Sequence, residues 1–577
     1  MGNDLIDRLS HWKLIGFLFI VSFFVLMFGN EMVSLTHPDE VFYAQTAKEM
    51  IHHHSWMTPY IFDTPQFEKP VLFYWLLIAA FKCFGVSAFA ARFWPAIFGM
   101  LGVIVTYWIA FMFFQNKKTA LFSGIVLCTS LIYLILSRAV LTDMVFSIWI
   151  TVALAFFVYG YLQREKRDAA IVSFFVFCAL AVLTKGLLGI VFPCGVVLVF
   201  LSVQKEWNYF KSWGTLAGII LFALIAVPWH AVMLKLYENR FVDEYWFNDH
   251  LRRVLEAEHA KSNTWYFYLF TLFTGMFPWS FFLIPAVYVI SKKIPSGNSL
   301  QDYTGLKFLL IWIATVYLIV QSAQSKLASY ILPAFPAMAI MLGYYFTQIL
   351  EGAGSFYTLK AMRIISYGIA GLLGVSSIGS LIFARKHMEL IPHPQPVYIF
   401  VGLALVCAFI IVQLTKRRQY IKTIFSIGCI PMVLVIFLMA GHTYAEPWVS
   451  CKTITEAFIR IDPTDHSVIL SSKFYLRGVR FYTDRKTAVL DINGEGFFSP
   501  HPVPFLNTDE KVLQFLKTQP VTYCILKKSN VEDVKRIAYQ DFNVEYFDPI
   551  ADKYILKITR KGFYWSFPNQ RRRGSPI

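Results

Sequence analysis

Charged residues are scarce in this chain of 577 residues: only 15% are Asp, Glu, Lys or Arg, whereas 57% are hydrophobic. A soluble globular protein carries about a quarter charged residues, so this composition excludes an ordinary soluble chain. The shortage is uneven, because residues 1–445 consist of repeated apolar runs and residues 446–577 read as a soluble sequence. We therefore expect two regions, one suited to lipid and one to water.

Cysteine pairs of the metal-binding type are also missing, since none of the eight cysteines forms a CxxC motif. Six lie in or beside apolar runs, where cysteine acts as a small hydrophobic residue. Cys451 and Cys524 lie in the soluble region and could pair in an oxidising compartment. The net charge of +16 does not indicate nucleic-acid binding, because much of it sits in short loops between apolar runs. We interpret the basic tail at 570–573 as a frayed end.

Long apolar runs dominate the first region. A helix that crosses the hydrocarbon core needs about 20 mostly apolar residues. Thirteen runs fit this template: 13–34, 93–114, 118–136, 142–163, 168–184, 187–204, 213–234, 267–290, 306–325, 330–350, 362–384, 397–414 and 424–445. The first shows no small-residue cleavage site and is interpreted as a span rather than a signal peptide. A shorter stretch, 70–85, contains Lys82, and we expect a helix near the membrane surface there.

Basic residues occupy every second loop between these runs. The positive-inside rule assigns those loops and the N-terminus to the cytoplasm, and residues 446–577 to the other side. We therefore expect a multi-pass membrane protein whose C-terminal domain lies on the non-cytoplasmic side. That domain alternates strand-like runs with helix-like runs, which predicts a compact α/β fold. The strand-like runs are 467–470, 522–526 and 554–557, and the helix-like runs are 510–517 and 531–538.

Polar residues gather at the outer ends of the predicted spans and in the outer loops 35–92 and 235–266. They are Asp39, Glu40, Tyr43, Glu68, Lys69, Arg138, Asp143, Lys185, His250, Arg252, Arg253, Lys326 and Tyr330. Ionisable groups at membrane depth are costly and are usually functional or paired. Taken singly, Asp39 could cap a helix, Asp143 could pair with Arg138, and the lysines could anchor the chain at the lipid head groups.

Taken together, two acids and several cations on one membrane face predict a site for a phosphorylated lipid. Lysine and arginine can hold the phosphate. A carboxylate can take a proton from an acceptor hydroxyl while the sugar–phosphate bond breaks, and the cations stabilise the leaving phosphate. The alternative class is a transporter or flippase of a lipid-linked or anionic substrate. Its charges would be expected near the midplane of the bilayer rather than at the outer ends of the spans.

The order of several short motifs resembles the lipid A aminoarabinose transferase family. This family belongs to the polyprenyl-phosphate-sugar transferases related to protein O-mannosyltransferases. The motifs are Pro38-Asp39-Glu40-Val41-Phe42-Tyr43-Ala44, Phe67-Glu68-Lys69-Pro70, Arg138 with Leu141-Thr142-Asp143, Thr184-Lys185-Gly186, His250-Leu251-Arg252-Arg253 and Ser325-Lys326-Leu327 with Tyr330-Ile331-Leu332-Pro333. The resemblance implies a mainly α, polytopic glycosyltransferase of the GT-C type with about 13 transmembrane helices and a C-terminal soluble α/β domain. It also implies a location in the bacterial inner membrane, with the active site and the C-terminal domain in the periplasm. The implied donor is a sugar on undecaprenyl phosphate, and the implied acceptor is lipid A or another periplasmic molecule.

The same resemblance assigns roles to individual residues. Asp39 matches the main catalytic aspartate and Asp143 a second acid. The residues matched to the donor phosphate are Lys69, Tyr330, Lys326 and Arg252 or Arg253. We expect supporting roles for Glu40, Tyr43, Arg138 and Lys185, and a monomer surrounded by membrane lipids.

A divalent metal such as zinc is implied at Glu68 and His250. A carboxylate and an imidazole suit zinc, but two ligands are too few for a closed site. The chain departs from the family in its first motif, where Phe42 replaces an arginine and Gln45 replaces a glutamate. These changes remove one charge of each sign beside Asp39, and they leave open a different sugar or a different acceptor, including a protein as in the O-mannosyltransferases.

Overall fold

The chain divides into two compact units in the computed structural model, which describes residues 3–257, 262–296, 300–351, 356–388, 393–464, 467–494, 496–497 and 502–561. The first unit comprises residues 1–34 and 46–445, and the second comprises residues 35–45 and 446–577. Residues 35–45 were predicted to lie in an outer loop of the membrane region, whereas the structure groups them with the C-terminal residues. The basic tail at 570–573 lies outside the described residues.

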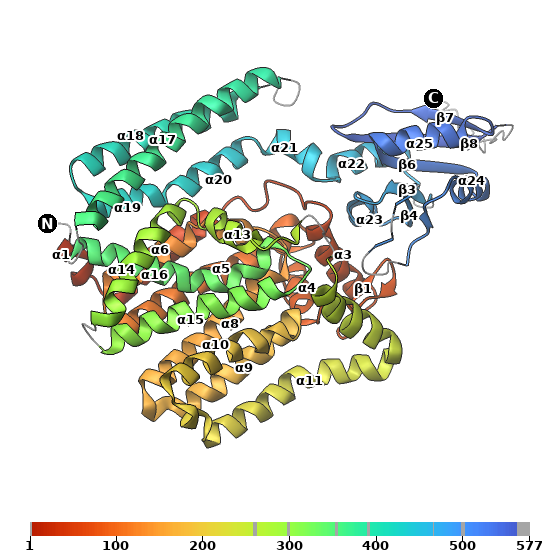
Figure 1. Cartoon of the computed structure of the whole chain (residues 1–577). Helices are drawn as coiled ribbons and strands as arrows, with labels where there is room; N and C mark the ends of the chain where they lie inside the picture. Colours follow the sequence, from red (N-terminus) through yellow and green to blue (C-terminus); the bar gives the residue numbers. More distant parts are fainter. Residues whose placement is uncertain are drawn as a thin grey trace, which may run out of the picture. The chain divides into compact units, whose positions relative to one another are not determined.

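Helices with a counterpart among the predicted spans make up most of the first unit (Figure 1). They are α2 (His11–Ser22) with η1 (Phe23–Met27), α5 (Ala88–Phe114), α6 (Lys117–Cys128) with α7 (Leu131–Ser137), α8 (Thr142–Leu162), α9 (Arg167–Lys185), α10 (Leu188–Gln204), α11 (Trp213–Phe241), α13 (Phe267–Gly275) with α14 (Leu283–Ser296), α15 (Leu300–Ser322), α16 (Phe335–Leu350), α17 (Phe356–Lys386), α18 (Gln395–Lys416), and α19 (Tyr420–Gly428) with α20 (Ile430–Ala440).

Shorter segments connect them. They are α1 (Asn3–Arg8), η2 (Arg164–Lys166), η3 (Trp207–Phe210), η4 (Val242–Arg252), α12 (Arg253–Leu255), η6 (Trp279–Phe282), η7 (Ala328–Ala334) and α21 (His442–Val449). The apolar stretch predicted at 70–85 forms α4 (Leu72–Phe84).

Helix lengths support the membrane assignment. Among the described residues, nine helices are long and apolar enough to cross a membrane, or eleven if two bent pairs each count as one span. The bends are 64° between α6 and α7 and 109° between α13 and residues 279–291. The two other predicted spans are the shorter apolar helices at 11–27 and 188–204. Every predicted span therefore has a helical counterpart, which confirms a mainly α, multi-pass membrane protein.

Burial separates the central helices from those that face lipid. In the most apolar window of the span that contains α16, 94% of the residues are buried, against 17% for α18. Helix α16 packs against α6, while α8 and α9 pack side by side (Figure 1). The apolar faces that α17 and α18 leave exposed suit the hydrocarbon core, where an apolar surface carries no hydration cost.

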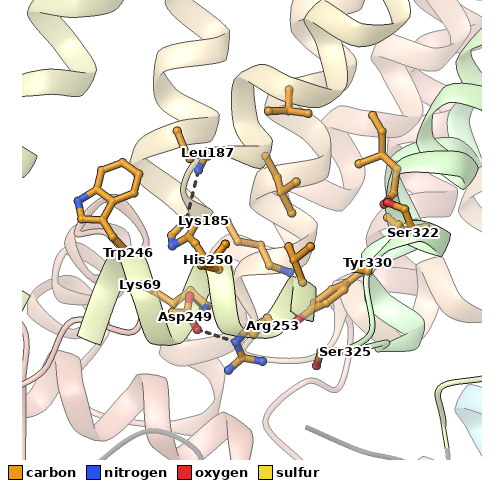
Figure 2. A pocket seen from close by; sticks show the side chains of 17 residues that line it. Lys69, Lys185, Leu187, Trp246, Asp249, His250, Arg253, Ser322, Ser325 and Tyr330 are labelled. Atoms are coloured by element: carbon orange, nitrogen blue, oxygen red, sulfur yellow. Dashed lines mark hydrogen bonds and ion pairs between the residues drawn. The ribbon is translucent and has the colours of Figure 1, made fainter. Parts of the chain in front are cut away.

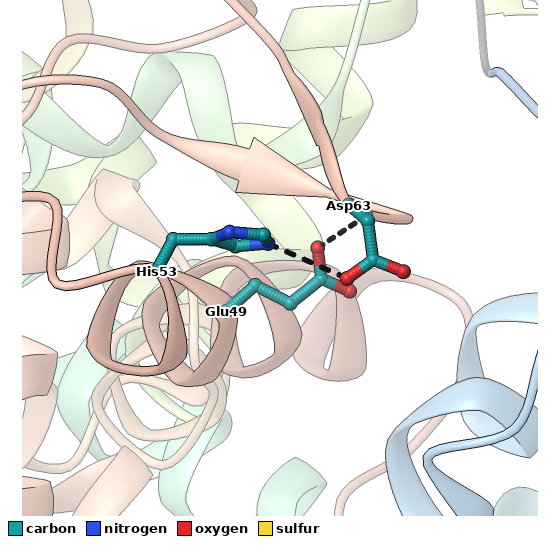
Figure 3. A group of neighbouring side chains, drawn as sticks. All are labelled: Glu49, His53 and Asp63. Carbon is teal, nitrogen blue, oxygen red and sulfur yellow. Dashed lines mark hydrogen bonds and ion pairs between the residues drawn. The ribbon is translucent and has the colours of Figure 1, made fainter.

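A small hairpin follows α3 (Asp39–His52). Strands β1 (Tyr60–Ile61) and β2 (Thr64–Pro65) pair antiparallel, and both residues of the turn, Phe62 and Asp63, have positive φ. The Glu49 carboxylate accepts a hydrogen bond from the backbone N–H group of Phe62 at 3.1 Å. It accepts another from the backbone N–H group of Asp63 at 2.8 Å (Figure 3). These bonds offset part of the strain of a turn without glycine.

A mixed six-stranded sheet forms the core of the second unit, with strand order β5-β4-β3-β6-β8-β7. Its strands are β3 (Ile469–Ser472), β4 (Thr487–Leu490), β5 (Phe505–Leu506), β6 (Val521–Lys527), β7 (Phe542–Tyr546) and β8 (Lys553–Arg560). Strands β5, β4, β3 and β6 pair in parallel, and β8 pairs antiparallel with both β6 and β7. The helices are α22 (Lys452–Ile461), α23 (Leu476–Thr483), α24 (Asp509–Thr518) and α25 (Lys528–Ala538). This confirms the predicted α/β domain.

The two cysteines of this unit pack on opposite faces of the sheet. Successive strand residues point to opposite faces, and on β3 Ile469 packs in one apolar cluster while Leu470 packs in the other. Cys451 belongs to the cluster of Ile469, and Cys524 belongs to that of Leu470. Both thiols are buried and free. The disulfide considered from the sequence is therefore not formed.

Candidate functional site

A cavity of about 460 Å³ lies in the first unit, lined by side chains from several distant segments (Figure 2). Its charged and aromatic lining comprises Lys69, Lys185, Trp246, Asp249, His250, Arg253 and Tyr330. Its apolar lining comprises Leu187, Leu188, Val191, Leu251, Val254, Ile319 and Val320. The cavity therefore combines a charged part with an apolar wall, which suits a ligand that is itself amphipathic.

Asp249 joins two cations in the charged part. One carboxylate oxygen lies 2.5 Å from the ammonium of Lys69, and the other lies 2.8 Å from Nε of Arg253. Asp249 is only 7% exposed. Arg253 follows it by four residues, the spacing that brings side chains together on a helix. Because buried charges need partners, this carboxylate holds both cations in place at the cavity wall.

A second ion pair joins Lys185 to Asp143. The ammonium of Lys185 lies 2.5 Å from Oδ1 of Asp143 and 4.5 Å from the ring centre of Tyr330. Lys185 ends α9 and Asp143 stands in the first turn of α8, so each charge lies where the helix dipole favours it. Asp143 therefore pairs with Lys185. It does not pair with Arg138, which was the alternative considered from the sequence.

His250 is oriented by the π-helical segment η4. Its Nδ1 lies 2.7 Å from the carbonyl oxygen of Tyr245, which can only accept, so Nδ1 carries a proton. Its Nε2 accepts a long contact, 3.5 Å, from the N–H of Leu187. The preceding Gly186 has φ of +97°, and a Cβ there would lie 2.3 Å from Nε2. Glycine is thus required for both the backbone and the approach of the imidazole.

Three predicted site residues point elsewhere. Arg252 pairs with the exposed Glu256 at 2.7 Å, so Arg253 rather than Arg252 lines the cavity. Lys326 donates to Asn263 at 2.7 Å and lies outside the cavity lining. Arg138 donates to the carbonyl oxygen of residue 25 at 3.1 Å, a contact typical of a structural anchor.

The residues of the first predicted motif belong to the second unit. Glu40 accepts from the backbone N–H and the hydroxyl of Thr36, at 2.9 and 2.8 Å, beside the start of α3. Tyr43 is buried, with its ring edge-on to that of Phe42. Asp39 opens α3, with its side chain 70% exposed and 3.9 Å from Arg477. Glu40 and Tyr43 therefore support the helix that presents Asp39.

Asp249 was not among the site residues predicted from the sequence. It directly precedes the motif at 250–253, and its spacing of four residues from Arg253 was the available signal. The ion pair between Asp249 and Lys69 could not be predicted, since 180 residues separate them in the chain.

Side chains that could bind a metal lie in two places. His250 presents an Nε2 lone pair and anchors its other ring nitrogen on a carbonyl, the usual arrangement for a histidine ligand. Within the described residues, one group of three potential metal ligands lies elsewhere, in the hairpin. It consists of Glu49, His53 and Asp63, whose ligand atoms lie within 4.8 Å of one another (Figure 3). Since Glu49 already receives two backbone N–H groups, we interpret that group as hairpin structure.

Comparisons with known proteins identify relatives of this chain. A family model described as dolichyl-phosphate-mannose-protein mannosyltransferase matches residues 12–241. An undecaprenyl phosphate-alpha-4-amino-4-deoxy-L-arabinose arabinosyl transferase from Enterobacter sp. (strain 638) is 31% identical, over 55% of this chain and 57% of that protein. The transferase of the same name from Erwinia tasmaniensis is 30% identical, over 63% and 64%. The matched region thus spans less than two thirds of either relative.

The fold has a solved counterpart. The crystal structure of ArnT from Cupriavidus metallidurans bound to undecaprenyl phosphate superposes with a TM-score of 0.74 at 19% identity, covering 95% of this chain and 97% of that one. The fold and the apolar helices thus define the class: a multi-pass membrane protein with the GT-C fold. Within that class, the curated relatives confirm the resemblance to the lipid A aminoarabinose transferase family that the motifs predicted.

Proposed function

We propose that the protein is a membrane glycosyltransferase that moves a sugar from undecaprenyl phosphate to lipid A or another periplasmic acceptor. The sugar is aminoarabinose or a close relative, and the reaction occurs at the periplasmic face of the bacterial inner membrane. The observation that carries this proposal is the cavity, which combines buried cations with an apolar wall. A sugar phosphate needs the cations, and a polyprenyl chain needs the apolar wall.

Charge balance supports a phosphodiester ligand. Lys69, Lys185 and Arg253 contribute three positive charges, and their partners Asp249 and Asp143 contribute two negative charges, which leaves one positive charge. A polyprenyl-phosphate sugar carries a single negative charge on its phosphodiester. The phosphodiester therefore matches the positive charge that these five side chains leave.

The proposed reaction is a displacement at the anomeric carbon of the sugar. The bond from this carbon to the phosphate oxygen breaks, undecaprenyl phosphate leaves, and the acceptor oxygen forms the new bond. Asp39, matched to the catalytic aspartate of the family, takes the proton of the acceptor. Lys69 and Arg253 stabilise the charge that develops on the leaving phosphate. Tyr330, below the ammonium of Lys185, completes the phosphate-binding wall.

A divalent metal remains part of the proposal. The Nε2 of His250 and the carboxylate of Glu68 would supply two ligands, and such an ion would add positive charge beside the donor phosphate. Elemental analysis of the purified protein by mass spectrometry tests this directly. We expect close to one equivalent of zinc, lost in His250→Ala; equal metal content in both proteins would remove the metal from the proposal.

The deciding experiment compares lipid A and periplasmic polymers by mass spectrometry in cells with and without the protein. A glycosylated product that disappears in the Lys69→Ala variant supports the transferase. Lipid-linked sugar that crosses the membrane without any glycosylated product would instead support the transporter alternative.

Protein is the second candidate acceptor, favoured by the match of residues 12–241 to the mannosyltransferase model. The same mass spectra distinguish the two, since a protein acceptor would carry a hexose on serine or threonine and leave lipid A unchanged.

A further inference from the structure

His230 lies on α11, outside the cavity lining, and forms hydrogen bonds through both of its ring nitrogens. Its Nδ1 lies 2.8 Å from the carbonyl oxygen of Ala226, which can only accept, so Nδ1 carries a proton. In the neutral ring Nε2 is then an acceptor, and the hydroxyl of Tyr245 donates to it at 3.0 Å. His230 thus presents one fixed acceptor to the segment η4.

Tyr245 connects this bond to His250. Its side chain is fully buried, and its own carbonyl oxygen accepts the Nδ1–H of His250 at 2.7 Å. The two residues are five apart, the spacing that one π-helical turn brings together. Tyr245 is therefore held twice: its hydroxyl bonds to α11, and its carbonyl group orients the imidazole that lines the cavity.

The turn between α9 and α10 packs against both groups. A Cβ on Gly186 would lie 3.1 Å from the hydroxyl oxygen of Tyr245 and 2.3 Å from Nε2 of His250. The same Nε2 lies 3.5 Å from the N–H of Leu187, which also lines the cavity (Figure 2). Because the contacts are this close, a shift of Tyr245 would displace Nε2 of His250 at the cavity wall.

A role in stability alone is the simpler explanation for the His230–Tyr245 bond, because a buried hydroxyl needs a hydrogen-bond partner. The form of η4 argues for more. π-Helices occur mostly as single turns and often at functional sites, yet η4 keeps this form over the 11 residues Val242–Arg252. Such a segment depends on contacts from outside it, and His230 supplies one at the residue whose carbonyl group orients His250.

We propose that His230 is a positioning residue of the cavity. By accepting the Tyr245 hydroxyl, it fixes the carbonyl oxygen that orients His250, and so directs Nε2 of His250 toward the cavity. The effect of His230 on sugar transfer rests on the proposed function, whereas its effect on the orientation of His250 does not.

Nitrogen NMR of the full-length protein with isotope-labelled histidines tests the orientation. The signals of His250 are those that disappear in His250→Ala, and we expect a protonated Nδ1 and an unprotonated Nε2 in the wild type. His230→Leu removes the acceptor and should spread the proton over both nitrogens of His250. His230→Gln should keep the wild-type state, because its side-chain oxygen can accept the Tyr245 hydroxyl.

His442→Leu is the matched control. His442 is also half-buried and bonds through Nδ1 to a carbonyl oxygen of its own chain, that of Met439, at 2.8 Å. It lies outside the cavity lining, so its replacement should leave the His250 signals unchanged.

Sugar transfer gives the functional readout. Loss of an outer partner of a histidine ligand costs about 10- to 100-fold in activity, and we expect a decrease of this size in His230→Leu. Tyr245→Phe removes the same bond and should act alike. The double variant should be no worse than either single variant, because both changes remove one interaction.

Thermal unfolding shows which variants are folded, and Tyr245→Phe tests the same bond if His230→Leu does not fold. Wild-type His250 signals in a folded His230→Leu or Tyr245→Phe protein would overturn the assignment. Additive losses of transfer in the double variant would overturn it too, as would a folded His230→Gln protein that changes the His250 signals as much as His230→Leu does. A wild-type protein that transfers no sugar would refute the proposed function, while the NMR spectra would still decide the role of His230.

Discussion

Asp249→Asn should separate the stability of the empty cavity from its affinity for an anion. The substitution keeps the shape of the side chain but removes the charge that lies 2.5 Å from the Lys69 ammonium and 2.8 Å from Arg253 Nε. Removing one member of a buried ion pair costs about 3–5 kcal/mol. We expect the lower end, about 3 kcal/mol, because both cations border the cavity and Lys69 also donates to the backbone oxygen of Glu68.

A phosphate should recover much of this loss. In the variant, the donor phosphate becomes the first anion to neutralise the two cations, so undecaprenyl phosphate should stabilise Asp249→Asn more than the wild type. The assay is thermal unfolding in detergent with and without undecaprenyl phosphate. Asp243→Asn, an exposed acid on the same helical segment, serves as the control and should change stability by less than about 0.5 kcal/mol.

Two results would refute this reasoning. An Asp249→Asn protein as stable as the wild type would show that the buried pairs contribute nothing to the fold. A destabilised variant that gains no more from undecaprenyl phosphate than the wild type would show that the cations do not meet the phosphate.

Three further predictions concern other parts of the chain. Asp39→Asn should abolish sugar transfer with an unchanged unfolding temperature, and residual transfer above about 1% in a product assay would exclude it as the base. Gly186→Ala should lower stability and sugar transfer more than Gly85→Ala does. Both glycines have positive φ, but only at Gly186 would the new Cβ meet the His250 ring. Equal effects of the two changes in thermal unfolding and activity would contradict this. Burial, and then the charge of Lys553, lower the pKa of His37 from 6.5 to about 4, so the folded domain favours the neutral ring. The free energy of unfolding should therefore fall as the pH drops from 6.5 to 4, by up to about 3 kcal/mol. His37→Gln should flatten this slope when unfolding is measured against pH.

Much of the membrane architecture could be predicted because hydropathy and loop charge act locally. Each span is recognisable from about 20 neighbouring residues, and each predicted run has a helix in the structure. The α/β domain was predictable for the same reason, as the run at 522–526 lies within β6 and the run at 510–517 lies within α24. Local periodicity carries this information without any knowledge of tertiary contacts.

The partners of the charged residues could not be predicted in this way. Lys185 and Asp143 are 42 residues apart, and Lys69 and Asp249 are 180 apart, so only the packing of the helices brings them together. Pairing of Asp143 with Arg138 was one alternative that the sequence left open, whereas in the structure Asp143 pairs with Lys185. The motif supplied the residue types, whereas the tertiary fold decided which cation meets which acid.

The single positive charge left in the cavity has a consequence for turnover. The proposed donor is a phosphodiester, but undecaprenyl phosphate, the proposed leaving group, is a monoester and gains further negative charge at neutral pH, as phosphate monoesters do with a second pKa near 6. If the donor binds in this cavity, the cavity attracts the spent carrier at least as strongly as the donor. We expect undecaprenyl phosphate to be a competitive product inhibitor, so that removal of the used carrier from the membrane sustains the rate.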